Sequence, residues 1–178
     1  MHIINTKFSG LKIIQQKKFG DSRGSLRETF RKKIIKWDNL IFDYATLSKK
    51  NVLRGFHFNS KYPQAKYVTV LRGKILDYVI DLRKKSKTFG KCFTIELSEK
   101  NCKSLYIPEG FAHAYYSFSN LNIIYYKLSN YYQPKYEDGI IWNDKILKNN
   151  WPNKKPIVSK KDKKLKTFSD FIKIYGGL

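Results

Sequence analysis

Short hydrophobic runs separated by turn signals dominate the sequence. The runs are rich in Ile, Val, Tyr and Phe and recur about every ten residues, the spacing of an all-β sandwich or barrel. Apolar and polar side chains alternate over residues 93–97, so one face of that strand should be buried and the other wet. The clearest expected strands are 67–71, 75–81, 92–97, 105–107, 114–118 and 123–128. We therefore predict an all-β fold of antiparallel sheets.

Helical patterns are short, and the end of the chain is irregular. Only 31–37 and 169–175 have a credible helical pattern. From residue 131 onward, prolines and many lysines predict an irregular segment. We expect its tail, residues 145–178, to wrap over the barrel and to be held by Trp142 and Trp151. With 178 residues in all, the chain is predicted to form one domain, 1–178.

Charge is the most extreme feature of the composition. Subtracting 14 acidic from 36 basic residues leaves a formal net charge of +22. The basic residues are 30 Lys and 6 Arg, whereas base readout and bidentate phosphate binding favour Arg. The lysines are scattered along the chain, so we interpret most of them as solvated surface and expect no nucleic-acid partner. A positive field still attracts a substrate that carries phosphates.

The sequence predicts a soluble cytoplasmic protein without a membrane partner. No apolar run reaches the roughly 18 residues that a membrane span needs. Residues 1–7 lack the basic and then apolar layout of a signal peptide. The two cysteines, Cys92 and Cys102, fit neither a disulfide framework nor a CxxC metal pair.

Histidine is scarce, which narrows the possible chemistry. Only His2, His57 and His113 occur. A cupin metal site needs a second histidine two residues after the first, but Phe58 and Asn59 follow His57, so no metal is expected. The glycine-rich loops of dinucleotide and triphosphate sites and the serine elbow of hydrolases are also absent, so no cofactor is expected. Acid–base chemistry by side chains is the remaining possibility.

His57 and His113 each have two interpretations. Strand alternation places His57 on the face opposite Phe56 and Phe58. A lone histidine on a strand is more often a hydrogen-bonded core residue than a catalytic one. His113 follows a Pro-x-Gly turn and leaves the same two possibilities open.

Other candidates are equally open when each is taken alone. Lys66 starts a strand among apolar residues, Tyr126 lies in an aromatic strand, and Asp162 lies in a charged segment. The ordinary interpretations are a surface lysine, a core tyrosine and an aspartate in a solvated tail. Arg23 and Arg54 are two of only six arginines, which favours a specific anion-binding role.

A series of motifs runs through the chain in a fixed order. They are FGDSRG at 19–24, KNVLRGFHF at 50–58, QAK at 64–66, DLR at 81–83, TFG at 88–90, IPEGFAH at 107–113, YK at 126–127, NYYQP at 130–134, WND at 142–144, WP at 151–152 and SKKD at 159–162. Through these motifs the sequence resembles the dTDP-4-dehydrorhamnose 3,5-epimerase family along nearly its whole length. The resemblance implies a metal-free, cupin-like antiparallel jelly roll that forms a homodimer, with the active site inside the barrel and the N-terminal segment reaching the partner subunit.

The resemblance also implies a role for each matching residue. By position, His57 resembles the base that removes a proton from a sugar carbon, and Asp162 the carboxylate that orients it. Tyr126 resembles the acid on the opposite face, and Lys66 and His113 resemble donors beside the C4 oxygen. The implied contacts with the nucleotide or diphosphate are Arg23, Glu28, Arg54, Glu137 and Lys161, of which Arg23 and Glu28 would reach the partner's site.

One position departs from the family pattern and bears on the substrate. Where the family has a Gln-x-Asn pair at the nucleotide, this chain has Phe42 and Tyr44. Aromatic faces favour stacking over the hydrogen-bond pattern of thymine. We therefore expect a nucleotide-linked 4-keto sugar inverted at C3, or at C3 and C5, for surface polysaccharides, with a GDP-linked 4-keto heptose as substrate. The alternative is dTDP-4-dehydro-6-deoxyglucose of the dTDP-rhamnose pathway.

Two other functions use the same scaffold. A keto-isomerase would form the same enolate but move the carbonyl group. A non-catalytic sugar-nucleotide-binding cupin would be expected to have lost His57, Tyr126 or Lys66, and all three are present.

Overall fold

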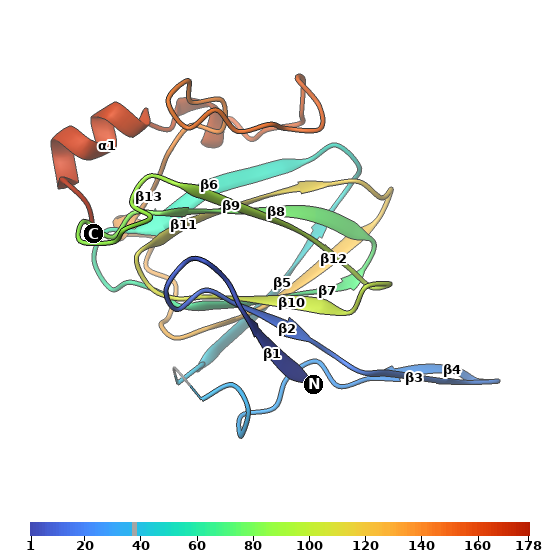
Figure 1. The fold of residues 1–178 in the computed structure, drawn as a ribbon. Helices are drawn as coiled ribbons and strands as arrows, with labels where there is room; N and C mark the ends of the chain where they lie inside the picture. Colours follow the sequence, from blue (N-terminus) through green and yellow to red (C-terminus); the bar gives the residue numbers. More distant parts are fainter. Residues whose placement is uncertain (37–38) are drawn as a thin grey trace.

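Two antiparallel sheets lie face to face and enclose the interior of a jelly roll (Figure 1). The computed structural model describes residues 1–36 and 39–178. One sheet has the strand order β1-β2-β10-β7-β12-β5 and the other β13-β6-β11-β8-β9, while β3 and β4 form a separate hairpin. The first six strands are β1 (His2–Asn5), β2 (Lys12–Gln15), β3 (Lys18–Asp21), β4 (Gly24–Arg27), β5 (Phe42–Ser48) and β6 (Leu53–Asn59). The others are β7 (Lys66–Arg72), β8 (Lys74–Asp81), β9 (Cys92–Ser98), β10 (Lys103–Ile107), β11 (Phe111–Ser117), β12 (Asn122–Leu128) and β13 (Glu137–Gly139).

The expected all-β, cupin-like jelly roll is confirmed, with one strand displaced. Strand β11 covers Phe111–Ser117, so it begins three residues before the expected 114–118 and ends one residue before it. Gly110 has φ +82 and its missing Cβ leaves room for Arg83, so the turn closes at Gly110 and the strand begins directly after it. The turn expected at Arg72 and Gly73 joins β7 to β8.

The helix expected at 31–37 is wrong over its described part, 31–36. The amides of Ile34 and Ile35 both donate to the carbonyl of Arg31, which makes a single turn. Ile35 is buried in a cluster with Tyr67 and Tyr106 of the six-stranded sheet. Its packing against these residues outweighs the weak helical pattern. Residue 37 lies outside the described residues.

The helix expected at 169–175 is present as α1 (Phe168–Tyr175), beside the short 3-10 turns η1 (Pro134–Tyr136) and η2 (Asp162–Lys164). Thr167 and Asp170 form a capping box at the start of α1, and Gly176 ends the helix in the left-handed conformation. None of the helices in the described residues has the length and apolar content to cross a membrane.

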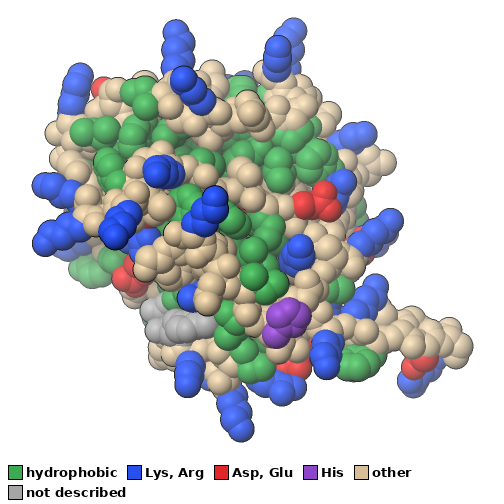
Figure 2. Space-filling model, viewed as in Figure 1, with side chains coloured by type: hydrophobic (Ala, Val, Ile, Leu, Met, Phe, Trp, Pro, Cys, Tyr) green, Lys and Arg blue, Asp and Glu red, His purple; other side chains and the backbone are tan. Residues whose placement is uncertain are grey.

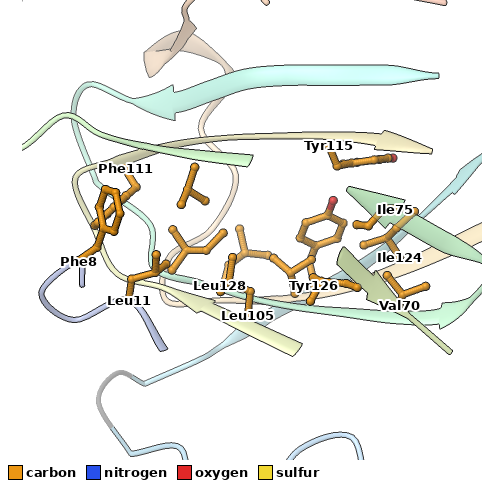
Figure 3. Packing of buried hydrophobic residues seen from close by; sticks show 14 residues of the cluster. Phe8, Leu11, Val70, Ile75, Leu105, Phe111, Tyr115, Ile124, Tyr126 and Leu128 are labelled. Carbon is orange, nitrogen blue, oxygen red and sulfur yellow. The ribbon is translucent and has the colours of Figure 1, made fainter. Parts of the chain in front are cut away.

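The core between the two sheets is formed by apolar side chains, among which Tyr115 and Tyr126 carry hydroxyl groups. Phe8, Leu11 and Phe111 lie at one end of this core (Figure 3). Tyr115 and Tyr126 enter the same core from opposite sheets. The jelly roll therefore encloses a half-polar interior in which chemistry can occur.

The C-terminal segment covers the outer face of the five-stranded sheet (Figure 1). The Trp151 Nε1 donates to the Trp142 carbonyl at 2.7 Å, and its ring centroid lies 4.0 Å from that of Tyr78 and 5.7 Å from that of Phe56. This packing brings Asp162 to β6, where the Gly55 amide donates to its Oδ2 at 3.1 Å.

The β3–β4 hairpin projects away from the jelly roll (Figure 1). Its Phe19 and Leu26 are 61% and 67% exposed, an unusual position for large apolar side chains. Lysine and arginine side chains are spread over the visible face of the molecule without gathering into one patch (Figure 2).

Candidate active site

A cavity of about 380 Å³ lies between the two sheets. Both sheets and the segment after β12 contribute to its wall. The lining residues are Phe42, Tyr44, Thr46, Arg54, His57, Phe58, Asn59, Gln64, Lys66, His113, Tyr115, Tyr126, Leu128, Tyr132 and Glu137. Imidazole, ammonium, phenol and carboxylate groups therefore line one partly open cavity.

His57 and Asp162 form a hydrogen-bonded pair at the wall of the cavity. The His57 Nε2 lies 2.8 Å from the Asp162 Oδ1. Burial opposes ionisation of Asp162, but the hydrogen bonds from His57 and from the Gly55 amide outweigh it, so the pKa of Asp162 lies below its usual value. The carboxylate fixes a proton on Nε2 and leaves Nδ1 free to accept a proton.

Glu137 stands beside the free nitrogen of His57. Its Oε1 lies 4.0 Å from the His57 Nδ1, and its Oε2 accepts hydrogen bonds from Lys161 Nζ and, at 3.0 Å, from the Tyr132 hydroxyl. Burial acts against its charge, yet Lys161 and His57 hold the pKa of Glu137 below its usual value. Glu137 is therefore an anion that favours a charged His57 once that base has taken a proton.

A second histidine–carboxylate pair joins the neighbouring strands β11 and β8. His113 is directly opposite His57 in the register of β11 and β6, and its Nε2 lies 2.8 Å from the Asp77 Oδ2. Both members of this pair are buried. Asp77 thus holds the His113 ring in one orientation at the cavity wall.

Lys66 provides an ammonium group inside the cavity. Burial lowers its pKa to about 8, and the negative charges of Glu137 and Asp77 act in the opposite direction. Lysine at such a site is charged at neutral pH but close to losing its proton. It can therefore stabilise a negative oxygen that forms during a reaction.

Tyr126 faces the histidines from the other sheet. Its ring centroid lies 6.0 Å from that of His113 and 4.7 Å from that of Tyr44, on which it stacks. Burial first, and then nearby Tyr115 and Tyr44, raise the pKa of Tyr126 well above its usual value. The phenol is therefore neutral and can donate a proton into the cavity.

The structure brings most of the expected site residues together. His57, Lys66, His113, Tyr126, Arg54, Phe42, Tyr44 and Glu137 line the cavity. Asp162 lies behind His57, and Lys161 reaches the site by its bond to Glu137.

Two expected residues lie apart from this cavity. Arg23 is exposed in the β3–β4 hairpin and pairs with Asp21, and Glu28, just after the hairpin, pairs with Arg31. The resemblance implies that Arg23 and Glu28 reach the partner's site. That placement requires a second chain, so it stays a prediction.

Several residues of the site were not expected from the sequence. Asp77 carried a signal, because an acidic residue within an apolar strand must be buried with a partner. Thr46 shares a face of β5 with Phe42 and Tyr44, which the two-residue period of a strand would have shown. Tyr115, which reaches β5 from the opposite sheet, carried no signal in the sequence.

Among residues 1–36 and 39–178, no group of three His, Cys, Asp or Glu side chains is arranged to hold a metal ion. The cofactor-free activity expected from the sequence stays a prediction.

Comparisons with known proteins agree on one family. The model of a family described as dTDP-4-dehydrorhamnose 3,5-epimerase matches residues 5–170. The dTDP-4-dehydrorhamnose 3,5-epimerase of Methanothermobacter thermautotrophicus is 38% identical over 170 residues, 92% of each chain.

Solved structures of sugar epimerases are also similar to this chain. A dTDP-6-deoxy-D-glucose-3,5-epimerase from Legionella pneumophila, in complex with dTDP-4-keto-L-rhamnose, is 37% identical with a TM-score of 0.88, covering 93% of this chain and 92% of that one. A 4-keto-6-deoxy sugar epimerase from the novobiocin gene cluster of Streptomyces spheroides is 27% identical with a TM-score of 0.93, covering 99% of this chain and 91% of that one.

Proposed function

Because this chain belongs to the dTDP-4-dehydrorhamnose 3,5-epimerase family and is an isomerase of nucleotide-linked 4-keto sugars, we propose that it inverts C3 and C5 of dTDP-4-dehydro-6-deoxyglucose. The observation that carries the proposal is the cavity itself. His57 on one sheet, paired with the Asp162 carboxylate, lies across the cavity from a neutral tyrosine on the other sheet. The cavity also holds Lys66, on which the negative charges of Glu137 and Asp77 act.

The base in this proposal is His57. Protons on C3 and C5 flank the C4 ketone, so removal of either one gives an enolate. The Asp162 carboxylate holds the proton on Nε2, and Nδ1 accepts the proton from carbon. The negative charges of Asp162 and Glu137 then stabilise the imidazolium ion.

Lys66 and His113 are the proposed donors to the ketone oxygen. The oxygen gains negative charge only as the proton leaves, so a fixed ammonium and imidazole stabilise the transition state more than the substrate. Asp77 orients His113 for this task, and its negative charge favours the charged form of Lys66.

Tyr126 is the proposed acid. Inversion requires a proton to return to the carbon from the face opposite the base. Tyr126 enters the cavity from the six-stranded sheet, whereas His57 belongs to the five-stranded one. A sugar ring between the two sheets would therefore meet base and acid on opposite faces.

The GDP-linked heptose expected from Phe42 and Tyr44 finds no support. The family model and the relatives of Methanothermobacter and Legionella carry dTDP-linked sugars in their names. Tyr44 stacks on Tyr126 and Phe42 packs on Tyr44 and Tyr131, so the two rings pack against the cavity wall. An aromatic wall can stack on thymine as well as on guanine.

Competition among nucleotides tests the proposed substrate. We expect dTDP to inhibit turnover of dTDP-4-dehydro-6-deoxyglucose more tightly than GDP, CDP or UDP, and product analysis by NMR to show inversion at both C3 and C5. Tightest inhibition by GDP, with no turnover of the dTDP-linked sugar, would contradict the proposal. A product with a moved carbonyl group would indicate the keto-isomerase instead, and binding without turnover the non-catalytic cupin.

Replacing Tyr126 by Phe should separate proton exchange from inversion. Without the phenol, His57 can still remove a proton and return deuterium to the same face, while protonation from the opposite face slows by about 100-fold, the usual weight of a general acid. NMR of the sugar in D₂O measures both events. Tyr125→Phe is the matched control, because that hydroxyl binds Asp43 and lies outside the cavity lining. Inversion by Tyr126→Phe at the normal rate would move the acid elsewhere, with Tyr132 as the next candidate.

The expected homodimer stays a prediction. The projecting hairpin, with Phe19 and Leu26 exposed, offers an apolar surface that a second chain could cover, and it carries Arg23. Light scattering of the purified chain measures the assembly directly. The cytoplasmic location expected from the sequence likewise stays a prediction.

A further inference from the structure

The guanidinium group of Arg54 is held against strand β5 by two hydrogen bonds. Its Nε donates to the Ser48 Oγ at 3.1 Å, and its Nη2 donates to the Leu47 carbonyl oxygen at 3.4 Å. Arg54 belongs to β6 in the five-stranded sheet, whereas Leu47 and Ser48 belong to β5 at the edge of the six-stranded sheet. The two bonds therefore tie a long, flexible side chain of one sheet to a hydroxyl group and a backbone carbonyl of the other.

The hydroxyl group that accepts from Arg54 is itself fixed. Ser48 is buried, and its Oγ lies 2.8 Å from the Tyr115 hydroxyl, which in turn lies 3.1 Å from the Thr46 Oγ1. The Ser48 carbonyl also accepts a hydrogen bond from Asn122 Nδ2 at 3.0 Å. Burial keeps water from taking the place of the Ser48 hydroxyl, so the acceptor has one defined position.

The two bonds to β5 use one edge of the guanidinium group. Nε and Nη2 form that edge, and each edge of the planar group can donate two parallel hydrogen bonds. The second edge, formed by Nη1 and Nη2, takes no part in these bonds, and Arg54 lines the cavity. Two parallel donors on a cation match two oxygens of a phosphate group.

Arg54 also lies at a suitable distance from the base. Among the described residues that line the cavity it is the only arginine. In the register of β6 and β11, Arg54 lies opposite Tyr115. His57 lies opposite His113, two residues away on β11, so the two positions are about 7 Å apart along the sheet. The diphosphate of a nucleotide sugar is attached at C1, which is two bonds from C3 and from C5, so a sugar with its reacting carbon at His57 brings its diphosphate toward Arg54.

We propose that Ser48 is a positioning residue, which holds one edge of the Arg54 guanidinium group so that the other edge binds the diphosphate of the substrate. Tyr115 supports this role by fixing the Ser48 hydroxyl. The proposal rests on the proposed function, in which the substrate is a dTDP-linked sugar. Ser48 touches no part of the substrate in this account and acts only through Arg54. Its loss should therefore weaken recognition of the diphosphate and leave the base and the acid intact.

Ser48→Ala tests the proposal with two ligands, dTDP and thymidine, which differ only in the diphosphate. Without the Ser48 oxygen the guanidinium group can turn away, so we expect the Kd for dTDP to rise by about tenfold, the weight of one hydrogen bond to a charged group. The Kd for thymidine should stay normal. Calorimetry measures the binding of dTDP, and NMR titration measures the binding of thymidine. With the sugar in D₂O, kcat/KM should fall while the ratio of inversion to exchange stays normal.

A double-mutant cycle separates positioning from a general structural role. Arg54→Ala alone should weaken the binding of dTDP at least as much as Ser48→Ala does. Adding Ser48→Ala to Arg54→Ala should then change the Kd for dTDP by less than about twofold, because no guanidinium group remains to be held. Independent effects would multiply instead.

Ser104→Ala is the matched control. Ser104 is a buried serine of the same six-stranded sheet, and it lies outside the cavity lining. Its hydroxyl accepts from Gln16 Nε2 at 2.7 Å and lies 2.6 Å from the Thr69 Oγ1. This variant loses a buried hydrogen-bonded hydroxyl group as Ser48→Ala does, but it should keep the normal Kd for both ligands.

The outcomes separate the two proposals. The positioning role is wrong if Ser48→Ala leaves the Kd for dTDP unchanged, raises the Kd for dTDP and thymidine by the same factor, or multiplies the effect of Arg54→Ala. If the unaltered protein binds dTDP but inverts no dTDP-linked 4-keto sugar, the proposed function fails while these binding measurements still decide the role of Ser48. If it binds no dTDP, both proposals fail. Should Ser48→Ala not fold, as judged by thermal unfolding, Tyr115→Phe decides in the same way, with an expected rise of about threefold in the Kd for dTDP.

Discussion

Replacing His57 by Asn is expected to abolish deuterium uptake at every sugar carbon, as well as inversion. Without the imidazole no enolate forms, and the loss should be about 10³ to 10⁴-fold, the upper range for a general base. Asparagine keeps a polar side chain opposite Asp162 but cannot take up a proton. Mass spectrometry or NMR of the sugar recovered from D₂O measures the uptake.

Two further variants sharpen this result. Asp162→Asn should be milder, because it disturbs the orientation and tautomer of His57 without removing the ring. His2→Asn is the control, because His2 is exposed on β1, outside the cavity lining, and should keep full activity. Deuterium uptake at the normal rate in His57→Asn would assign the base elsewhere, with Tyr126 the next candidate.

Replacing Lys66 by Met should reduce both exchange and inversion by about 100 to 1,000-fold, as loss of one oxyanion donor does. The ammonium stabilises the enolate, which precedes both outcomes, so the ratio of the two should stay near normal. That ratio distinguishes this variant from Tyr126→Phe. Lys74→Met is the control, because Lys74 pairs with Glu96 away from the cavity.

The same lysine predicts a pH dependence. Burial lowers the pKa of Lys66 to about 8. The charged form dominates below that pH and is lost above it, so kcat/KM should fall on the alkaline side with a midpoint near pH 8. Lys66→Met should lack this limb. An unchanged alkaline limb in the variant would show that another group causes it.

Local patterns in the sequence were sufficient for some of the strands, whereas β1 to β6 and β13 were not among the clearest expected strands. Strands β7 to β10 and β12 lie where hydrophobic runs and turn signals place them, because each run is long enough to define its own period. The run at 31–36 has a helical period over too few residues. Burial of Ile35 against Tyr67 decided its conformation instead.

The residues of the site also fall into those that the sequence could predict and those that it could not. His57, Lys66 and Tyr126 could be named from their motifs, which persist as short contiguous signatures. The sequence indicates that Asp77 is buried with a partner, but it indicates neither that this partner is His113 nor that Tyr115 reaches β5, because a single strand carries no information about what faces it across the sheet or the barrel. Tyr44 shows the limit most clearly, since its aromatic character is visible in the sequence while its stacking on Tyr126 is not.

The sequence by itself determined the all-β class, most of the strands between residues 66 and 128 and the set of titratable residues available for acid–base chemistry, because alternation and residue type are local properties of the chain. Only the tertiary structure decided which of those residues meet. The C-terminal segment delivers Asp162 to His57 from 105 positions away, and β11 carries Tyr115 across the interior to β5. The physical reason is that such contacts depend on how two sheets close around one cavity. That closure is set by the packing of the whole core and not by any segment alone.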